Sequence, residues 1–213
     1  MILSKLICKV WFKTINLFIL EKNHVQYGKF NIVGRIRIYR EHPLIEKCPK
    51  TSIFIGDRFG CNSGLKYNPI GGDTCTILRT IDNGTIVIGN NVGMSNATLV
   101  AWNKIEIEDD VTIGGGVKIY DNDFHSLNYQ LRVFRPYDDI ASRPVKICKG
   151  AFIGAGSYIL KGVTIGEKSV IGAGSVVSKD IPAGEVWAGN PVRFIKKINN
   201  KRKCFPKVYK RYD

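Results

Sequence analysis

An aliphatic side chain recurs at every sixth position through the second half of the chain. The series is Ile147, Ile153, Ile159, Ile165, Ile171 and Val177, and a small or β-branched residue lies two positions before each member, at Val145, Ala151, Ser157, Val163, Ser169 and Ser175. A spacing of six fits neither the 3.6-residue turn of an α-helix nor the two-residue alternation of a sheet strand. It predicts a short strand followed by a turn, repeated, with the aliphatic side chain always pointing inward.

Three such units would close one triangular coil, and successive coils would stack at the ~4.8 Å spacing of hydrogen-bonded strands. The same register occurs earlier in the chain, at Ile107, Ile113 and Ile119, at Ile88, Met94 and Val100, and more faintly at Ile55 and Cys61. The pattern therefore predicts an all-β parallel solenoid over residues 30–192, preceded by an N-terminal segment, residues 1–29, and followed by a C-terminal segment, residues 193–213.

The first twenty residues have a different pattern. They are strongly apolar but are interrupted by Lys5, Lys9 and Lys13, whose spacing of four places them along one stripe of a helix. Three charges within the stretch argue against a membrane-spanning helix, and no small-residue cleavage site follows an apolar run. Two interpretations remain open: an interfacial helix whose lysines meet anionic lipid headgroups, and a helix or arm packed against the body or a neighbouring subunit.

The six-residue period stops between Ile119 and Val145. The interruption, residues 120–144, begins with the sequence Tyr-Asp-Asn-Asp-Phe-His and contains His125, one of three histidines in the chain. A solenoid gains no packing from a long excursion, and loops that leave a rigid scaffold often carry function. His125 is therefore the first candidate for a catalytic side chain.

Several stretches resemble the hexapeptide-repeat acyltransferases, in particular the maltose, galactoside and exopolysaccharide O-acetyltransferases. The resemblance covers roughly residues 85–198 and is carried by Ile147-Cys-Lys-Gly-Ala-Phe-Ile-Gly-Ala-Gly-Ser, by Gly162-Val-Thr-Ile-Gly, by Ile171-Gly-Ala-Gly-Ser-Val-Val-Ser-Lys-Asp-Ile-Pro and by Ala188-Gly-Asn-Pro-Val-Arg. It implies a left-handed parallel β-helix, a homotrimer, acetyl-CoA as the acetyl donor and a carbohydrate acceptor. The wording around His125 is similar to that of the polysaccharide-modifying members.

The resemblance also assigns roles to individual residues. His125 would act as general base, because a neutral imidazole can remove the proton of a sugar hydroxyl as its oxygen attacks the thioester carbonyl. Ser95 stands near the place where the sugar acetyltransferases carry an asparagine, and its hydroxyl could donate a hydrogen bond to the developing oxyanion. Coenzyme A would contact Ala155, Ala173, Ser178, Lys179, Arg193 and Lys196.

Three further residues are candidates for the acceptor side: Asp121, Asp123 and Asn103. The two aspartates could orient the imidazole or bind the sugar, or they could simply cap the loop backbone as turn residues. Amino-acid, antibiotic and nucleotide-sugar acceptors remain alternatives to a glycan hydroxyl.

Charge limits the other classes of function. The chain has 32 basic and 18 acidic side chains, and residues 51–192 are nearly neutral, with 13 basic and 14 acidic, whereas residues 1–50 carry 10 and 3 and residues 193–213 carry 9 and 1. A basic module that binds nucleic acid is one alternative, but the charge avoids the body and no nucleic-acid-binding motif is present. We therefore expect no nucleic-acid partner.

A zinc-dependent carbonic anhydrase on the same fold is a second alternative, and it needs three histidine ligands. His24 and His42 precede the clearly periodic region without ligand spacing, so we expect no metal. Six cysteines without a CxxC pair fit reduced, packed thiols and a cytoplasmic protein, with peripheral membrane contact through residues 1–20 as an open extension.

Overall fold

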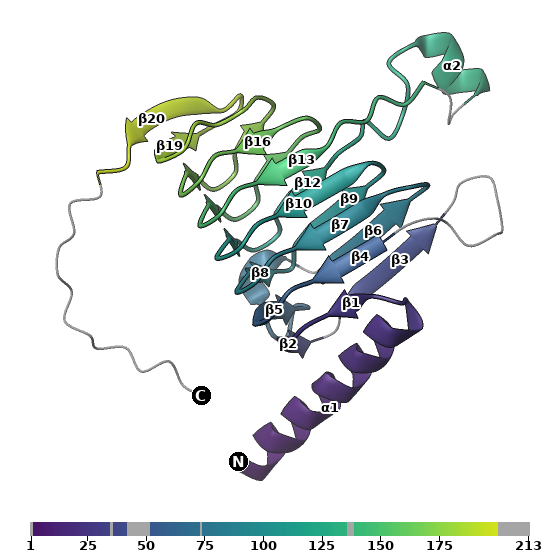
Figure 1. Cartoon of the computed structure of the whole chain (residues 1–213), viewed down its shortest axis with the longest axis vertical. Coiled ribbons are helices and arrows are strands. Elements are labelled where there is room, and N and C mark those ends of the chain that lie inside the picture. The colour runs from purple at the N-terminus through teal and green to yellow at the C-terminus, as the bar shows by residue number, and fades with distance from the viewer. Residues whose placement is uncertain (1, 35, 42–51, 73, 136–138, 200–213) are drawn as a thin grey trace.

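The computed structural model describes residues 2–34, 36–41, 52–72, 74–135 and 139–199. Helix α1 (Ile2–Lys22) is followed by a stack of short strands that form three parallel sheets, which we call A, B and C (Figure 1). The chain visits the sheets in the fixed order A, B, C, so each complete coil contributes one strand to every side of a triangular prism. We call the edges between the sheets the AB, BC and CA corners.

The strand bounds follow the coil order. Sheet A contains β1 (Gln26–Tyr27), β4 (Ser52–Ile55), β7 (Thr85–Ile88), β10 (Lys104–Ile107), β13 (Val145–Ile147) and β16 (Thr164–Ile165). Sheet B contains β2 (Phe30–Gly34), β5 (Phe59–Ser63), β8 (Gly93–Ser95), β11 (Thr112–Ile113), β14 (Phe152–Ile153), β17 (Val170–Ile171), β19 (Glu185–Ala188) and β20 (Arg193–Lys197). Sheet C contains β3 (Arg37–Glu41), β6 (Ile77–Ile81), β9 (Thr98–Ala101), β12 (Lys118–Tyr120), β15 (Tyr158–Ile159) and β18 (Val176–Val177).

The six-residue period becomes three vertical columns of aliphatic side chains. Ile107, Ile147 and Ile165 pair in sheet A, Ile113, Ile153 and Ile171 pair in sheet B, and Ile119, Ile159 and Val177 pair in sheet C. All nine are at most 2% exposed. Each buried aliphatic side chain contributes about 1.5–3 kcal/mol, so the columns form the continuous core that holds successive coils together.

Small residues turn the chain at the corners, as the sequence predicts. At the BC corner the buried hydroxyls of Ser157 and Ser175 donate hydrogen bonds to the carbonyl of Gly172, at 3.1 and 2.6 Å. These bonds satisfy a backbone acceptor inside the turn without occupying the volume of a larger side chain. Cys61 also behaves as a small core residue: it is buried, and burial raises the pKa of its thiol to about 12.

Helix α1 closes the N-terminal end of the prism (Figure 1). Leu20 is fully buried in the core, and the side-chain carbonyl of the buried Asn16 accepts a hydrogen bond from the backbone N–H of Ile36 at 3.3 Å. The last two turns of α1 therefore pack against the body, which is one of the two interpretations left open by the sequence. The side chains of residues 2–9, with Lys5 and Lys9, lie outside the described part, as do residues 200–213 and His42.

Two segments leave the coil path. The first lies between β5 and β6 at the BC corner and contains the short helix η1 (Pro69–Gly71). The second lies between β12 and β13 at the CA corner, contains α2 (Tyr129–Phe134), and projects away from the prism in Figure 1. The second segment coincides with the interruption that the sequence places at residues 120–144, although no helix is predicted there from the period alone.

Replacing Gly154 by alanine should lower the free energy of unfolding by about 1–3 kcal/mol, the usual cost of overpacking. A Cβ atom at Gly154 would lie 2.5 Å from the backbone nitrogen of Ala173 in the next coil, where only a backbone shift could relieve the contact. Gly60→Ala is the matched control, because a Cβ there meets nothing within 4 Å. Denaturant unfolding of both variants checks the prediction, and equal stabilities would contradict it.

Candidate functional site

His125 stands at the CA corner, where the second excursion leaves the prism. Its side chain is exposed, and its backbone N–H donates to the carbonyl of Asp123 at 2.7 Å across a tight reversal. Phe124, at the centre of this reversal, has a φ of 62°, and its backbone N–H donates to the side-chain carbonyl of Asn122 at 2.9 Å. Such a conformation costs a non-glycine residue about 1–2 kcal/mol, so the surrounding contacts must hold it in place.

Aromatic packing fixes the side chain of Phe124 beneath the loop. Its ring meets the ring of Tyr120 edge to face, with centroids 5.0 Å apart, and Tyr120 contacts Tyr158 of the next coil at 6.4 Å. Burial raises the pKa of Tyr120, so its hydroxyl stays protonated over the physiological range. The contacts tie the reversal to sheet C and leave the imidazole of His125 facing solvent.

Asp121 is fully buried and holds the base of the excursion. Its carboxylate accepts hydrogen bonds from the backbone N–H groups of Trp102, at 2.8 Å, and Asn103, at 2.6 Å, in the coil below. Its backbone carbonyl accepts from the N–H of Arg143, at 2.8 Å, where the chain returns to the prism. These contacts match the turn-capping interpretation of Asp121 and leave its carboxylate without solvent access.

Asp123 lies nearer the surface and forms an ion pair with Lys161. The ammonium nitrogen of Lys161 is 2.6 Å from Asp123 Oδ1, and both side chains are only about one-fifth exposed, at 21% and 22%. The other carboxylate oxygen, Asp123 Oδ2, is buried and has no hydrogen-bond partner among the described residues. Lys161 thus clamps the excursion onto the next coil.

Lys161 is a site residue that the sequence analysis did not single out. Because Ile119 pairs with Ile159, the residue two positions after each of them occupies the same corner, which places Lys161 one coil beyond Asp121. That register is present in the sequence and could have found it. The Arg132 guanidinium also braces the excursion, since its Nη1 donates to the backbone carbonyls of Ser126 and Leu127 at 3.0 and 3.3 Å.

The residues proposed for the donor occupy more than one edge of the prism. Ser95, the last residue of β8, lies at the BC corner, as do Ala155 and Ala173, which follow β14 and β17. Ser178 and Lys179 follow β18 and therefore lie at the CA corner, several coils beyond Asn103. Arg193 and Lys196 are exposed on β20, which pairs antiparallel with β19.

The Lys179 ammonium has a defined neighbour. It lies 4.9 Å from the ring centroid of Trp187, whose indole N–H donates to Glu185 at 2.8 Å and whose ring contacts Phe194 edge to face. The cation is thereby positioned above an aromatic surface next to β20, where it remains exposed.

One chain does not bring all of the candidate residues together. His125, Asp123 and Asn103 lie at the CA corner, whereas Ser95 lies at the BC corner, on the opposite edge of sheet C. The neighbour of Ser95, Asn96, is buried and uses its amide to hold the first excursion, accepting from the N–H of Gly64 at 2.7 Å and donating to the carbonyl of Asn68 at 3.2 Å. A site that contains both His125 and Ser95 requires the BC corner of a second copy.

No group of three histidine, cysteine or carboxylate side chains suited to a metal ion occurs within the described residues. His24 follows α1 at the N-terminal end of the prism, many coils from His125, and His42 is outside the described part. The side chains described here therefore do not fit a three-ligand metal centre within one chain, and we derive no step through a metal.

Comparison with known proteins places the repeat in an established family. Residues 144–179 match the family described as bacterial transferase hexapeptide (six repeats). The chain is 38% identical over 123 residues to galactoside O-acetyltransferase of Escherichia coli (strain K12), covering 55% of this chain and 59% of that protein. It is 27% identical over 179 residues to gamma carbonic anhydrase 2, mitochondrial, of Arabidopsis thaliana, covering 78% and 54%.

Solved structures share the fold over most of the chain. A galactoside acetyltransferase in complex with coenzyme A superposes with a TM-score of 0.55 at 25% identity, covering 93% of this chain and 86% of that one. A mutant of AntD, an N-acyltransferase from Bacillus cereus, in complex with dTDP-4-amino-4,6-dideoxyglucose and coenzyme A, superposes with a TM-score of 0.62 at 22% identity, covering 85% and 89%.

The fold and the repeat together define a hexapeptide-repeat protein with a left-handed parallel β-helix. The resemblance to the hexapeptide-repeat acyltransferases, inferred from the sequence, is confirmed. The chain spans about half the length of the curated relatives it matches, 54% and 59% of the two named above.

For the acetyl transfer proposed below, Lys161→Met is expected to reduce the turnover number and to leave the KM for acetyl-CoA nearly unchanged, because Lys161 would act through the excursion that carries His125. It should also cost about 1–2 kcal/mol of stability, since the Asp123 carboxylate loses its partner in a partly buried place. Steady-state kinetics of the acetyl transfer proposed below and denaturant unfolding measure the two effects.

Two further variants test this prediction. Lys161→Arg keeps the charge and should restore most of the turnover number. Lys168→Met is the matched control, because it removes a lysine whose ion pair with Glu167, also 2.6 Å long, is exposed at 64% and 51%. Equal kinetic effects of Lys161→Met and Lys168→Met would show that the clamp has no positioning role.

Proposed function

We propose that the protein is an acetyltransferase that uses acetyl-CoA and transfers the acetyl group to a hydroxyl of a sugar or of a cell-surface polysaccharide or its precursor. The observation that carries the proposal is the position of His125. It is an exposed imidazole on a braced reversal, at the place where the coil of a hexapeptide-repeat prism opens. The similarity to galactoside O-acetyltransferase supports the type of reaction.

His125 acts as a general base in this proposal. Its imidazole takes the proton of the acceptor hydroxyl while the hydroxyl oxygen attacks the thioester carbonyl, so that a C–O bond forms as the C–S bond breaks. The thiolate of coenzyme A leaves and takes up the proton from the imidazolium. Ser95 of a second copy donates a hydrogen bond to the oxygen on which negative charge develops.

The proposed donor site takes Ala155 and Ala173 from the BC corner, Ser178 and Lys179 from the CA corner beyond β18, and Arg193 and Lys196 from β20. Ala155 and Ala173 allow the pantetheine arm to lie against the backbone, because neither side chain projects beyond its Cβ atom. Lys179, Arg193 and Lys196 are exposed and supply positive charge for the phosphates, and Ser178 offers a hydroxyl beside them. Coenzyme A bound in the galactoside acetyltransferase structure supports this choice of donor.

A homotrimer is part of the proposal. Each prism carries His125 at its CA corner and Ser95 at its BC corner. In a closed ring of three copies, the CA corner of one copy can meet the BC corner of the next, and each such contact completes one site. The separation of His125 from Ser95 across sheet C supports this assembly. Asp123 and Asn103 would then face the acceptor from the His125 side.

The six cysteines include no CxxC pair. This pattern is typical of reduced thiols, so we propose that the enzyme is cytoplasmic.

The decisive experiment is incubation of the purified chain with labelled acetyl-CoA and a panel of monosaccharides, oligosaccharides, amino acids, nucleotide sugars and antibiotics. We expect label on a carbohydrate, in a form that hydroxylamine releases as an ester. An amide product resistant to hydroxylamine would instead establish N-acetylation, which the similarity of the fold to that of AntD keeps as a second candidate.

Two other outcomes would overturn the proposal. Bound zinc with hydration of carbon dioxide, and without acetyl transfer, would place the chain with the carbonic anhydrases that it resembles over 78% of its length. Salt-dependent binding of DNA, with no thermal shift on addition of acetyl-CoA, would identify a basic binding module instead.

A further inference from the structure

Helix α1 exposes large apolar side chains on the side that faces away from the prism. Val10, Trp11 and Phe18 are 59%, 62% and 64% exposed, and Trp11 and Phe18 are separated by two helical turns. The opposite side of the same helix carries Asn16 and Leu20, both fully buried against the body. One side of α1 therefore packs against the body, and the opposite side exposes its aromatic side chains to solvent. We call Val10, Trp11, Ile15 and Phe18 the outer face of α1.

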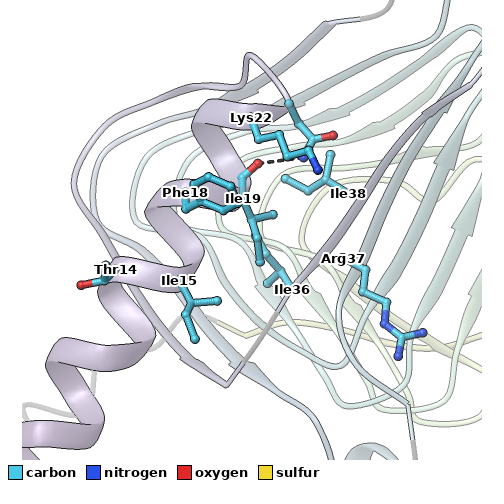
Figure 2. A pocket seen from close by; sticks show the side chains of 9 residues that line it. Thr14, Ile15, Phe18, Ile19, Lys22, Ile36, Arg37 and Ile38 are labelled. Carbon is cyan, nitrogen blue, oxygen red and sulfur yellow. Dashed lines mark hydrogen bonds between the residues drawn. The ribbon is translucent and has the colours of Figure 1, made fainter.

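The apolar surface continues from the outer face into a groove. Ile15, Phe18 and Ile19 of α1 lie across from Ile36 and Ile38, and the groove between them has a volume of about 710 Å³ (Figure 2). Together they make one connected apolar surface at the N-terminal end of the molecule, away from the excursion that carries His125 (Figure 1). The catalytic proposal does not use this surface.

Positive charge borders the apolar surface. Lys22 on α1 and Arg37 on β3 are exposed and line the groove. The helix contains one acidic residue, Glu21, which accepts a hydrogen bond from the Tyr27 hydroxyl at 3.1 Å. A second copy of this basic surface would repel the first, whereas a surface of anionic headgroups above acyl chains complements both its charge and its apolar character.

We propose that the outer face of α1 docks the protein on an anionic lipid surface. Trp11 and Phe18 enter the boundary between headgroups and acyl chains, where aromatic side chains are favoured, and Lys22 and Arg37 meet the lipid phosphates. The helix lies in the plane of the interface. None of the helices in the described part of the chain is long and apolar enough to span a membrane.

The test measures binding of the full chain to sedimented vesicles of phosphatidylcholine, with and without an equal part of phosphatidylglycerol. We expect the full chain to bind the anionic vesicles and to bind them more weakly at high salt. For Trp11→Ser/Phe18→Ser the partition coefficient should fall by about tenfold or more. Phe134→Ser is the matched control: Phe134 is 73% exposed but lies on α2, and its loss should leave vesicle binding unchanged.

Fluorescence identifies the face that touches lipid. Acyl chains carrying bromine should quench tryptophan emission in the wild type, and Trp11→Phe should bind as well but lose most of the quenching. The proposal is overturned if the full chain ignores anionic vesicles, if Trp11→Ser/Phe18→Ser binds like the wild type, or if quenching persists in Trp11→Phe. It is also overturned if Trp11→Ser/Phe18→Ser alters the mass of the protein in solution, because the face would then join copies of the chain. Acetyl transfer to a soluble acceptor should be the same in the wild type, in Trp11→Ser/Phe18→Ser and in Trp11→Phe. Vesicle binding is therefore tested independently of the proposed reaction.

Discussion

His125→Ala is expected to lower kcat/KM for acetyl transfer by about 10²–10⁴-fold, the usual contribution of a general base. The fold should survive, because the side chain is exposed and the reversal is held by a backbone hydrogen bond, by Asn122 and by the packing of Phe124 on Tyr120. The loss should appear mainly in kcat, since the imidazole removes a proton during the reaction and contributes little to holding acetyl-CoA.

The measurement needs a histidine control and a check on assembly. His24→Asn replaces the other described histidine, which is exposed at the end of α1 with a φ of 50°, a conformation that asparagine tolerates. It should retain full activity. Both variants should have the molecular mass of the wild type by light scattering. An active His125→Ala protein would remove His125 from the mechanism, and an altered mass would point to a structural role.

The fold could be predicted from the sequence because its repeat is local. Each coil places the same residue type at the same point, so the spacing of Ile147, Ile153 and Ile159 already determines three inward-facing columns, and the structure pairs them as expected. Small residues at corners, such as Ser157 and Ser175, follow the same rule. The period also predicted the position of the second excursion, because the regular spacing stops at Ile119 and resumes at Val145.

The contacts that hold the site could be predicted only in part. The register of Ile119 with Ile159 places Lys161 at the corner of Asp121, but the atoms that pair depend on the irregular path of the insertion: Asp121 bonds to Trp102 and Asn103 one coil below, and Asp123 pairs with Lys161 one coil above. The six-residue register places Ser95 after the second unit of its coil and His125 after the third, whereas the resemblance aligns residues only along the chain and therefore groups the two in one site.

Helix α1 shows a similar limit. The sequence identifies a helix with a lysine stripe and apolar neighbours, but the side that faces the body depends on tertiary packing. Asn16 and Leu20 decide it, because Asn16 bonds to the Ile36 backbone and Leu20 enters the core. Lys13 lies one turn from Asn16 and two turns from Leu20, on the same side of the helix as both, so aromatic side chains and not Lys13 form the outer face.

Asp121→Ala is expected to destabilise the protein by about 2–5 kcal/mol, because it removes a fully buried carboxylate that accepts from the partly buried backbone N–H groups of Trp102 and Asn103. The excursion should also lose its attachment at the base, so acetyl transfer should fall together with stability. Asp180→Ala is the matched control: Asp180 accepts from the N–H of Thr164 at 2.7 Å, but it is exposed, and water can replace it.

The pH dependence of this loss has a definite sign. Burial raises the pKa of Asp121 above its ordinary value, although hydrogen bonds from Trp102, Asn122 and Asn103 oppose the shift. A raised pKa in the folded state means that folding favours the protonated carboxyl, so this contribution is fully present below the unfolded pKa and is lost as pH rises through the folded one. The stability difference between the wild type and Asp121→Ala should therefore widen as the solution is acidified from neutral pH. Denaturant unfolding at a series of pH values measures it, and a difference that narrows in acid would mean that the hydrogen bonds outweigh burial and that the carboxylate is held in its charged form.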